Sequence, residues 1–333
     1  MLVWSERRHG RRHVGGRHLT GQKPGGPYSS RPRPVEGSVM SSLAVLIVLF
    51  AAVCHAAWNV IAHGVSRIGL PFLWWGAVAS TVIWIGVVPF TGGLGATDLT
   101  AFLLGVGVSG VLHVGYMLVL QRGYAVGQLS TVYATARGTG PTISVIVAVL
   151  LLGERPSVVA LFGVAAILAG VVAIGLTDRG KGMPRLPGGR SRRRVDPSVV
   201  YGLLTGVAIA AYTIWDAHAV RTWGLSPVAF MVGCTLIEIP VYTVALGRRR
   251  AELGAVFRKH WPKLIAFGVL SPLSYILVLV AITMAPVALV APMREISVIL
   301  VSLFGVFVLR EARPGWRIAA SLIVVVGVAL LAL

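Results

Sequence analysis

The sequence is poor in charge, and poorest in negative charge. Of its 333 residues 12% are charged, against about 25% in a typical soluble domain, and 56% are hydrophobic. This balance excludes a soluble globular enzyme. The 30 basic residues outnumber the 11 acidic ones, and the net charge of +19 would by itself suggest nucleic-acid binding. However, residues 1–39, 178–197 and 247–263 carry +16 of this charge, so it belongs to a tail and two loops. We therefore expect a multi-pass membrane protein with no nucleic-acid partner.

Cysteine and the common catalytic motifs are also scarce. The two cysteines, Cys54 and Cys234, lie in apolar runs and have neither disulfide nor metal-ligand spacing. The sequence has no Gly-x-x-x-x-Gly-Lys-Ser/Thr phosphate loop, no His/Cys/Asp cluster with metal spacing and no Gly-x-Ser-x-Gly turn. We expect no enzyme activity, no ATP hydrolysis, no metal and no cofactor.

Long apolar runs are what the sequence has in abundance. A helix needs about 20 apolar residues to cross the hydrocarbon core of a bilayer, and ten such runs are separated by short connections rich in Gly, Pro or basic residues. They predict ten transmembrane helices over 41–63, 70–90, 100–121, 129–152, 157–176, 199–220, 225–246, 264–284, 288–309 and 314–333.

The ten segments form two halves that resemble each other at a shift of 157 residues. Four pairs of polar or aromatic residues are related by this shift: Arg137 and Arg294, Glu154 and Glu311, Trp58 and Trp215, Asn59 and Asp216. We predict an all-α integral membrane protein of two five-helix repeats, 41–177 and 198–333, joined by the basic linker 178–197. Because each repeat has an odd number of spans, the copies should be inserted with opposite orientation, as in many secondary transporters.

The end of the fourth segment reads Leu152-Gly153-Glu154-Arg155-Pro156, and the fifth is rich in Gly, Ala and Val. With two tandem five-helix units, this resembles the EamA family of the drug/metabolite transporter superfamily. Residues 141–175 resemble its most recognisable segment and 287–333 its second copy, which departs from the pattern at Arg310-Glu311-Ala312-Arg313. The resemblance implies a transporter, often an exporter, of small polar metabolites or amphipathic compounds.

Residues 1–39 are rich in Arg, His, Gly and Pro without apolar periodicity, which predicts a disordered extension; alternatively, the protein starts at Met40. With ten spans, this tail shares a membrane side with loops that contribute two basic residues, whereas the opposite side carries eighteen. Because cytoplasmic loops carry the Lys/Arg excess, the charge count favours outward-facing termini in the cell membrane. The family resemblance favours cytoplasmic termini.

Five charged residues lie near the centres of the predicted spans, where each costs at least about 2.5 kcal/mol on insertion scales: Arg137, Asp216, Glu238, Arg294 and Glu295. Since the two arginines occupy equivalent repeat positions, we expect them to bind a substrate carboxylate or phosphate through bidentate hydrogen bonds. The alternative is an internal salt bridge, Arg137 with Asp216 or Arg294 with Glu238.

The three carboxylates are candidates for coupling transport to protons, since burial favours their neutral form. At about 100° per residue, Glu295 should point away from its neighbour Arg294 along a continuous helix. His55 and His113 could also titrate, although a structural hydrogen bond is the interpretation that we weigh more.

Each repeat places a tryptophan beside a polar residue, Trp58 next to Asn59 and Trp215 next to Asp216. We expect these four residues to form aromatic and hydrogen-bonding walls of the substrate site. The alternative is that the tryptophans pack while the polar atoms bond to a neighbouring helix.

Three tyrosines are further substrate-site candidates. Tyr133 lies one turn before Arg137, and a Gly/Pro cluster at 138–141 should loosen the helix there. Tyr116 and Tyr275 occupy equivalent places in the third and eighth spans, where the alternative roles are interfacial anchoring or packing.

Glu154 and Glu311 border the membrane, and we expect each to cap the helix that follows it in the sequence and to favour a tight turn. Gly163, Ala166 and Gly170 share one helical face, which allows close helix packing or contact between two copies of the chain.

The sequence thus predicts a secondary transporter that moves an amino-acid-like or amphipathic metabolite by alternating access, driven by a proton or solute gradient. Sugar or nucleotide-sugar transport is the rival within this class. From another class, the alternative is a membrane-embedded lipid-linked transferase, which would show clustered acidic metal ligands at a membrane face.

Overall fold

The computed structural model describes residues 40–63, 65, 68–95, 98–126, 129–178, 197–307 and 314–331. These residues fold into helices and turns, without a strand among them, and all belong to one compact unit, Pro34–Leu333. The predicted tail 1–39 and almost all of the linker 178–197 lie outside the described residues, as does Glu311. Tyr133 lies in a helix, but its side chain is outside the described part.

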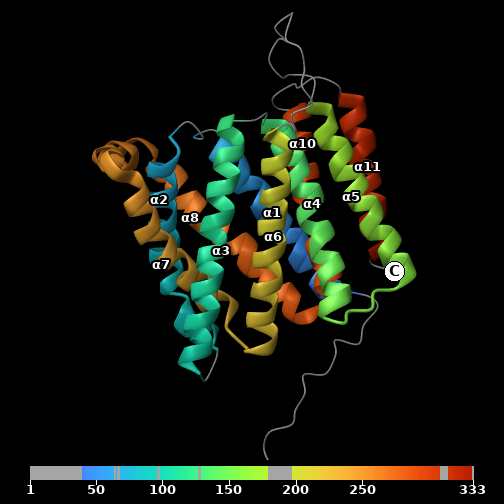
Figure 1. The fold of residues 1–333 in the computed structure, drawn as a ribbon, viewed down its shortest axis with the longest axis horizontal. Coiled ribbons are helices and arrows are strands. Elements are labelled where there is room, and N and C mark those ends of the chain that lie inside the picture. The colour runs from blue at the N-terminus through green and yellow to red at the C-terminus, as the bar shows by residue number, and fades with distance from the viewer. Residues whose placement is uncertain are drawn as a thin grey trace, which may run out of the picture. The chain divides into compact units, whose positions relative to one another are not determined.

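Helix occurs within all ten predicted segments (Figure 1). The α-helices are α1 (Ser42–His63), α2 (Leu70–Ile85), α3 (Leu99–Val126), α4 (Leu129–Leu151), α5 (Val158–Asp178), α6 (Pro197–Thr222), α7 (Pro227–Leu246), α8 (Leu253–Met284), α9 (Val287–Met293), α10 (Ile296–Phe307) and α11 (Pro314–Leu331). Two 3₁₀ turns, η1 (Val88–Thr91) and η3 (Gly247–Glu252), follow α2 and α7.

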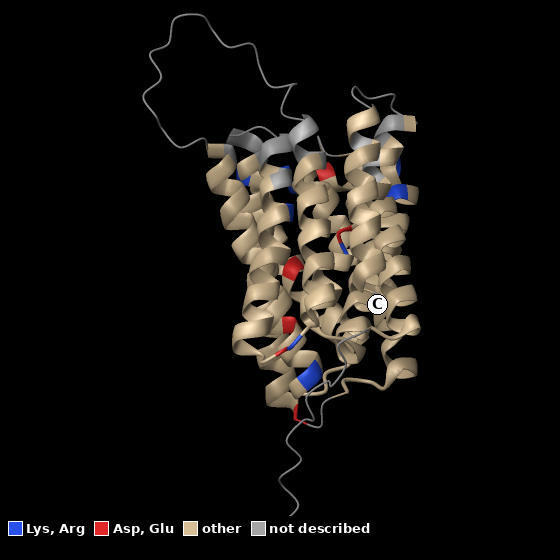
Figure 2. Cartoon of the chain, turned by 90° about the vertical axis from the view of Figure 1, so that its right-hand side faces the viewer, with Lys and Arg blue, Asp and Glu red and all other residues tan. Residues whose placement is uncertain are grey.

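The helices have the length and composition of membrane spans. Among the described residues, four stretches are long and apolar enough to cross a bilayer: Ser42–Ala62, Leu99–Gly123, Val199–Thr222 and Pro227–Met284, the last of which contains both α7 and α8. Shorter apolar helices cover Leu70–Ile85, Thr135–Leu151, Val158–Ala173 and Ile318–Leu331. Figure 2 shows that the described helices carry few Lys, Arg, Asp or Glu residues along their length.

Two predicted boundaries are wrong. The eighth segment was expected from residue 264, but α8 begins at Leu253, because the basic residues before 264 end the apolar run without ending the helix. The ninth segment was expected to be one helix, but it is two, α9 and α10, separated by a turn at Arg294 and Glu295. Backbone bonds between residues three apart, Glu295 N–H to Pro292 O and Val298 N–H to Glu295 O (both 2.9 Å), tighten the chain at this break.

The fourth segment, by contrast, is a continuous helix through its Gly/Pro cluster. Pro141 removes one backbone donor, yet hydroxyl groups in the next turn bond to carbonyls nearby. Thr142 donates to Gly138 O (2.6 Å) and Ser144 donates to Gly140 O (3.0 Å). These hydroxyl groups do not bond to Arg137 O, the carbonyl that Pro141 leaves without its helical donor, but α4 is nevertheless continuous through 138–141.

The helices of the two sequence halves interleave. α1 packs on α8 and α3 packs on α6, while α2 contacts α7 and α8 and α3 also contacts α7. α4 lies against α6, α5 and α9, and α5 pairs with α11 at one side of the bundle (Figure 1).

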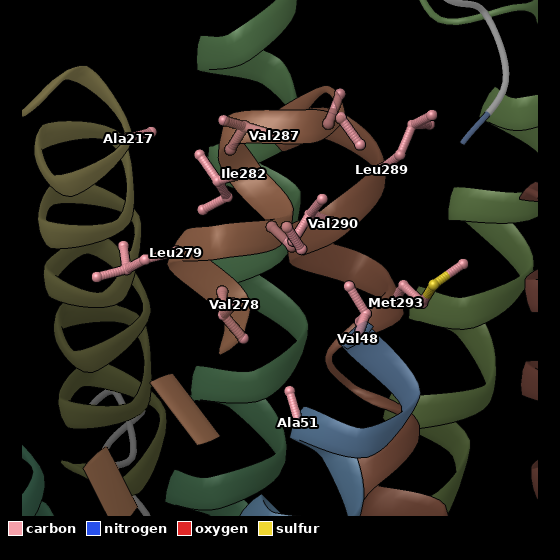
Figure 3. Close-up of a cluster of buried hydrophobic side chains, with 14 of the residues drawn as sticks. Val48, Ala51, Ala217, Val278, Leu279, Ile282, Val287, Leu289, Val290 and Met293 are labelled. Atoms are coloured by element: carbon pink, nitrogen blue, oxygen red, sulfur yellow. The ribbon is translucent and has the colours of Figure 1, made fainter. Parts of the chain in front are cut away.

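α9 lies in the middle of the largest hydrophobic cluster. All seven of its residues are buried, and the six other than Pro292 are 0–2% exposed. Figure 3 shows Val287, Leu289, Val290 and Met293 of this helix among side chains of α1, α6 and α8. The core therefore holds α9 from several sides and fixes the position of the turn that follows it.

Candidate functional site

An ion pair connects a helix of the first half with the helix break in the second half. Arg137 of α4 donates from Nη1 to both carboxylate oxygens of Glu295, at 3.2 Å each. Glu295 is completely buried and Arg137 is 8% exposed. Arg137 Nη2 also lies 2.8 Å from His55 Nε2 on α1. Because a guanidinium only donates, His55 Nε2 is the acceptor, so His55 is neutral with its proton on Nδ1.

The second arginine is less well satisfied. Arg294 Nε lies 3.7 Å from Glu295 Oε1, beyond hydrogen-bond distance, and it has no hydrogen-bond partner among the described residues although the side chain is 4% exposed. We expected Glu295 to face away from Arg294. That expectation is wrong, because the helix ends at this point and the turn brings the two side chains within ion-pair distance.

Neither of the internal salt bridges anticipated from the sequence forms. Arg137 pairs with Glu295 instead of Asp216, and the ion pair of Arg294 is with Glu295 instead of Glu238. One carboxylate thus serves two guanidinium groups, so the cluster of Arg137, Arg294 and Glu295 carries one excess positive charge. This excess is suited to an anion.

Asp216 on α6 is the centre of a second polar group. Its carboxylate is completely buried, and Oδ2 accepts a hydrogen bond of 2.5 Å from the Tyr275 hydroxyl of α8. His113 Nε2 of α3 lies 3.9 Å from the same oxygen, while its Nδ1 lies 3.0 Å from the Ser109 backbone carbonyl and therefore donates to it. Oδ1 of Asp216 has no hydrogen-bond partner among the described residues.

Aromatic rings join the two polar groups. Tyr212 stacks on His113, with ring centroids 4.2 Å apart, and contacts Tyr116 and Tyr275 edge to face. Arg294 interacts electrostatically with Tyr212, Tyr275 and Asp216. Two of the tyrosines expected at the site, Tyr116 and Tyr275, are therefore part of one aromatic cluster beside Asp216.

The two tryptophans that were predicted to line the substrate site form hydrogen bonds between helices. Trp58 donates from Nε1 to Ser274 Oγ of α8 (3.3 Å), and Trp215 donates to the Gly105 carbonyl of α3 (2.9 Å). Asn59 bonds within its own helix to His55 O (2.7 Å). The two tryptophan contacts agree with the packing alternative, whereas Asn59 bonds to its own helix and not to a neighbouring one. Trp58 also lies edge to face against His55, the neighbour of Arg137, with ring centroids 4.9 Å apart.

Glu238 of α7 is half-buried, unlike Asp216 and Glu295. It interacts electrostatically with His113, and it forms no ion pair with an arginine in the described part of the chain.

Glu154 caps a helix, but not the expected one. Its two carboxylate oxygens accept hydrogen bonds from the backbone N–H groups of Val287 and Ala288, each at 2.9 Å, which are the first residues of α9. The helix that follows Glu154 in the sequence is α5, whose start is bonded instead by the Ser157 hydroxyl, which accepts from Ala160 N–H (3.1 Å). The expectation was wrong because sequence order does not show which helix start lies nearest in space.

Arg221 completes this cap and was missed by sequence reasoning, which counted it only as a loop charge. At the end of α6 it donates from Nη1 to Glu154 Oε1 (2.6 Å) and from Nη2 to the Ala285 carbonyl (3.0 Å). Three helix ends, those of α4, α6 and α8, are thereby tied to the beginning of α9. No local pattern around Arg221 signals this contact.

The described residues contain no group of three or more His, Cys, Asp or Glu side chains that could hold a metal ion. The free cysteines, Cys54 and Cys234, are both buried, and Cys234 donates weakly to the Ser109 hydroxyl (3.4 Å).

Comparison with known proteins shows that the second half of the chain matches a family of membrane proteins. Residues 196–333 match the model of the EamA-like transporter family. No curated protein matches the chain. Among solved structures 29 chains match, and one, titled "Crystal structure of protein", is 17% identical with a TM-score of 0.65 over 88% of this chain and 99% of that chain. At this identity the likeness shows the fold alone.

The family match confirms the sequence prediction for the C-terminal half and does not extend to residues 141–175, whose resemblance stays a prediction. This chain is therefore a helical, multi-pass membrane protein in which residues 196–333 match the EamA-like transporter family.

Proposed function

We propose that the protein is a secondary transporter that exports a small zwitterionic metabolite with an apolar part across the cell membrane by alternating access. One observation carries the choice of solute. Two buried polar atoms without hydrogen-bond partners, Arg294 Nε and Asp216 Oδ1, have opposite charge and belong to groups that interact electrostatically. A zwitterion offers a carboxylate to the first and an ammonium group to the second.

Unpaired buried polar atoms are costly, which is why they mark a binding site. Leaving a buried donor or acceptor unsatisfied costs about 1–3 kcal/mol, and more for a charged group. A solute carboxylate on Arg294 would recover this cost and neutralise the excess charge of the Arg137, Arg294 and Glu295 cluster. The rings of Tyr212 and Tyr275 contact each other edge to face beside Asp216 and suit an apolar or aromatic side chain.

The proposed transport cycle rests on two inverted repeats, and the helix packing supports that relation. Under the 157-residue shift, Gly163 corresponds to Ala320 and Gly170 to Gly327. A side chain at Gly163 would meet the Gly327 carbonyl at 2.7 Å, and one at Gly170 would meet the Ala320 carbonyl at 2.8 Å. These two contacts exchange under the shift, as a two-fold axis between α5 and α11 requires.

The remaining packing follows the same pattern. The contact of α1 with α8 corresponds to that of α6 with α3, and the contact of α2 with α8 corresponds to that of α7 with α3. A broken helix that carries charged residues at its break is also a recurrent feature of substrate sites in transporters built from repeats. We propose the break between α9 and α10 as that element here.

Asp216 is the proposed coupling residue. A solute ammonium group and a proton would compete for the same carboxylate, so binding of one would release the other. Glu238 and Glu295 are the alternative coupling residues. We expect Asp216→Asn to abolish the response of transport to an imposed pH gradient, because the amide cannot release a proton. An unchanged response in this variant would assign coupling to another group.

Transport by the purified full-length chain in proteoliposomes tests the solute class. The probe is uptake of a labelled amino acid with an apolar side chain, in competition with its amide, its N-acetyl derivative, a hexose and a nucleotide sugar. We expect the parent amino acid to compete and both derivatives to fail, because each lacks one charge. Competition by the hexose or nucleotide sugar alone would favour the sugar alternative, and equal competition by all compounds would contradict a polar site.

A further inference from the structure

A basic and aromatic surface lies where α7 ends and α8 begins. None of its residues takes part in the proposed transport cycle. We call it the juxtamembrane surface and define it by these residues: Arg248, Arg249, Arg250, Phe257, Arg258, Lys259, Trp261 and Lys263. It exists because α8 starts eleven residues before the apolar run that was predicted to span the membrane. All eight residues are exposed.

The aromatic members form a strip along α8. Phe257 is 44% exposed and Trp261 is 52% exposed, and Ile265, one turn further, is 46% exposed. Their spacing of four residues places them on one helix face. This strip continues directly into the apolar part of α8, so the aromatic rings lie at the boundary between the apolar and basic parts of the helix. Tryptophan is enriched at that boundary in membrane proteins.

The basic members lie in the same turns of α8 as this strip. Arg258 adjoins it, at about 100° from Phe257 around the helix, whereas Lys259 and Lys263 lie at about 200° and 240°, toward the other face, and all three are exposed. Within the described residues, neither these three nor Arg248 forms a hydrogen bond or an ion pair. Their charges are therefore not compensated by the protein.

The segment that carries these charges is held in place. Trp75 of α2 donates to the Leu253 carbonyl (2.9 Å) and its ring lies against Phe257, with centroids 4.6 Å apart. Arg249 donates to the Ile68 carbonyl (2.9 Å) and pairs with Glu252 (2.8 Å). Glu252 is the one acidic residue of 247–263, and its carboxylate is paired with Arg249. The surface is therefore preorganised, with its free cations on a docked helix.

We propose that the juxtamembrane surface binds the headgroups of anionic phospholipids. The cations supply the attraction for the phosphate groups, and the adjoining aromatic strip fixes the helix at headgroup depth. A soluble polyanion would use the cations but would have no use for an exposed aromatic strip that leads into the lipid-facing part of α8. The proposal does not depend on the solute or on the coupling ion.

The test is a count of the lipids bound to the full-length protein in nanodiscs that contain phosphatidylglycerol and phosphatidylcholine in equal amounts, measured by native mass spectrometry after release. We expect phosphatidylglycerol to be enriched on the wild type. In the variant R258Q/K259Q the enrichment of bound phosphatidylglycerol should be lower by a factor of about five or more, since each cation near an anionic surface contributes about 1 kcal/mol. Trp261→Leu should weaken it less, because the charges remain.

The matched control is R122Q/R155Q, which also removes two exposed positive charges, from the ends of α3 and α4. It should keep the enrichment. Unchanged phosphatidylglycerol binding by R258Q/K259Q, or an equal loss in the control, would refute the proposal. Full displacement of the lipid by inorganic phosphate at the same total charge would also refute it, by assigning the surface to soluble anions. The thermal unfolding midpoints of all variants should match the wild type, and the single variant Lys259→Gln provides the test if the double variant does not fold.

Discussion

Two arginines at equivalent places in the two halves have different surroundings, and the comparison shows what a helix break adds. Arg137 lies within the continuous helix α4 and contacts Glu295 and His55. Arg294 lies in the turn between α9 and α10, and its Nε has no hydrogen-bond partner in the described part of the protein. The first is a fixed charge held by the protein, whereas the second has bonding capacity left for a solute.

The position of proline and its neighbours explains the difference. Pro141 lies four residues after Arg137, and Thr142 and Ser144 follow with hydroxyl groups that bond to the backbone of α4. Pro292 lies two residues before Arg294, and Met293, which follows it, has no hydroxyl group. The proline thus follows Arg137 within a continuous helix, whereas it precedes Arg294 at the end of α9, and prolines are a common cause of kinks and breaks in helices.

The largest expected effect separates the two arginines. Arg137→Ala removes the main partner of buried Glu295, which should lower the free energy of unfolding by about 3–5 kcal/mol and abolish transport. Arg294→Ala should also abolish transport but should cost much less stability, about 1 kcal/mol, since Glu295 keeps Arg137. Both are measured by thermal unfolding and by uptake into proteoliposomes, with the lysine variants as controls. Equal stability loss in the two alanine variants would remove the distinction between a fixed and a free arginine.

A second prediction concerns how α9 is held. Glu154→Gln keeps the size of the side chain but loses the charge that binds Arg221 and two backbone N–H groups, so we expect a loss of about 2 kcal/mol. Transport should decline through a raised KM, because Arg294 at the far end of α9 is then less well placed. The matched control is Glu252→Gln, an exposed carboxylate paired with Arg249, which should leave KM unchanged. A fall in kcat with constant KM would place Glu154 outside the positioning of the site.

The third prediction compares the removal of each of the two prolines. Pro292→Ala restores a backbone donor at the break and should extend α9 toward α10, raising stability while lowering transport. Pro141→Ala lies in a helix that is already continuous and should leave transport almost unchanged. Helix content from circular dichroism and uptake measured on the same samples report both effects. If Pro292→Ala keeps full transport, the break is not needed for the cycle.

The smallest effect is expected from the hydroxyl groups of α4. Thr142→Val and Ser144→Ala remove side-chain bonds to the backbone, each of which contributes about 0.6 kcal/mol inside a membrane protein. In the double variant, α4 should become less stable near Arg137, which hydrogen exchange of its backbone amides would detect. Thr222→Val, in a hydroxyl contact at the exposed end of α6, is the control.

Much of the fold was predictable because it depends on local composition. Apolar runs of sufficient length give helices wherever they occur, so helix is present in every predicted segment. The cost of burying charge likewise pointed to Arg137, Asp216, Arg294 and Glu295, all of which are buried. These inferences need no knowledge of which helices are neighbours.

The partners of those residues were not predictable, because they depend on contacts between distant parts of the chain. Glu154 lies 133 residues from Val287, whose N–H it binds, and Trp58 lies 216 residues from Ser274. The helix break was missed for a related reason. A proline alone does not end a membrane helix, since α4 continues through Pro141 whereas α9 ends directly after Pro292 and Met293.

The cap on α9 has a mechanical consequence. With seven residues at about 1.5 Å each, α9 is a rod of roughly 10 Å, fixed at one end by Glu154 and Arg221 and carrying Arg294 at the other. Its sides are enclosed by the hydrophobic core. A rod this short transmits a displacement of its anchored end almost undiminished to its far end. Rearrangement of the helix ends at one face of the protein would therefore displace Arg294 together with α9 and the core side chains that enclose it.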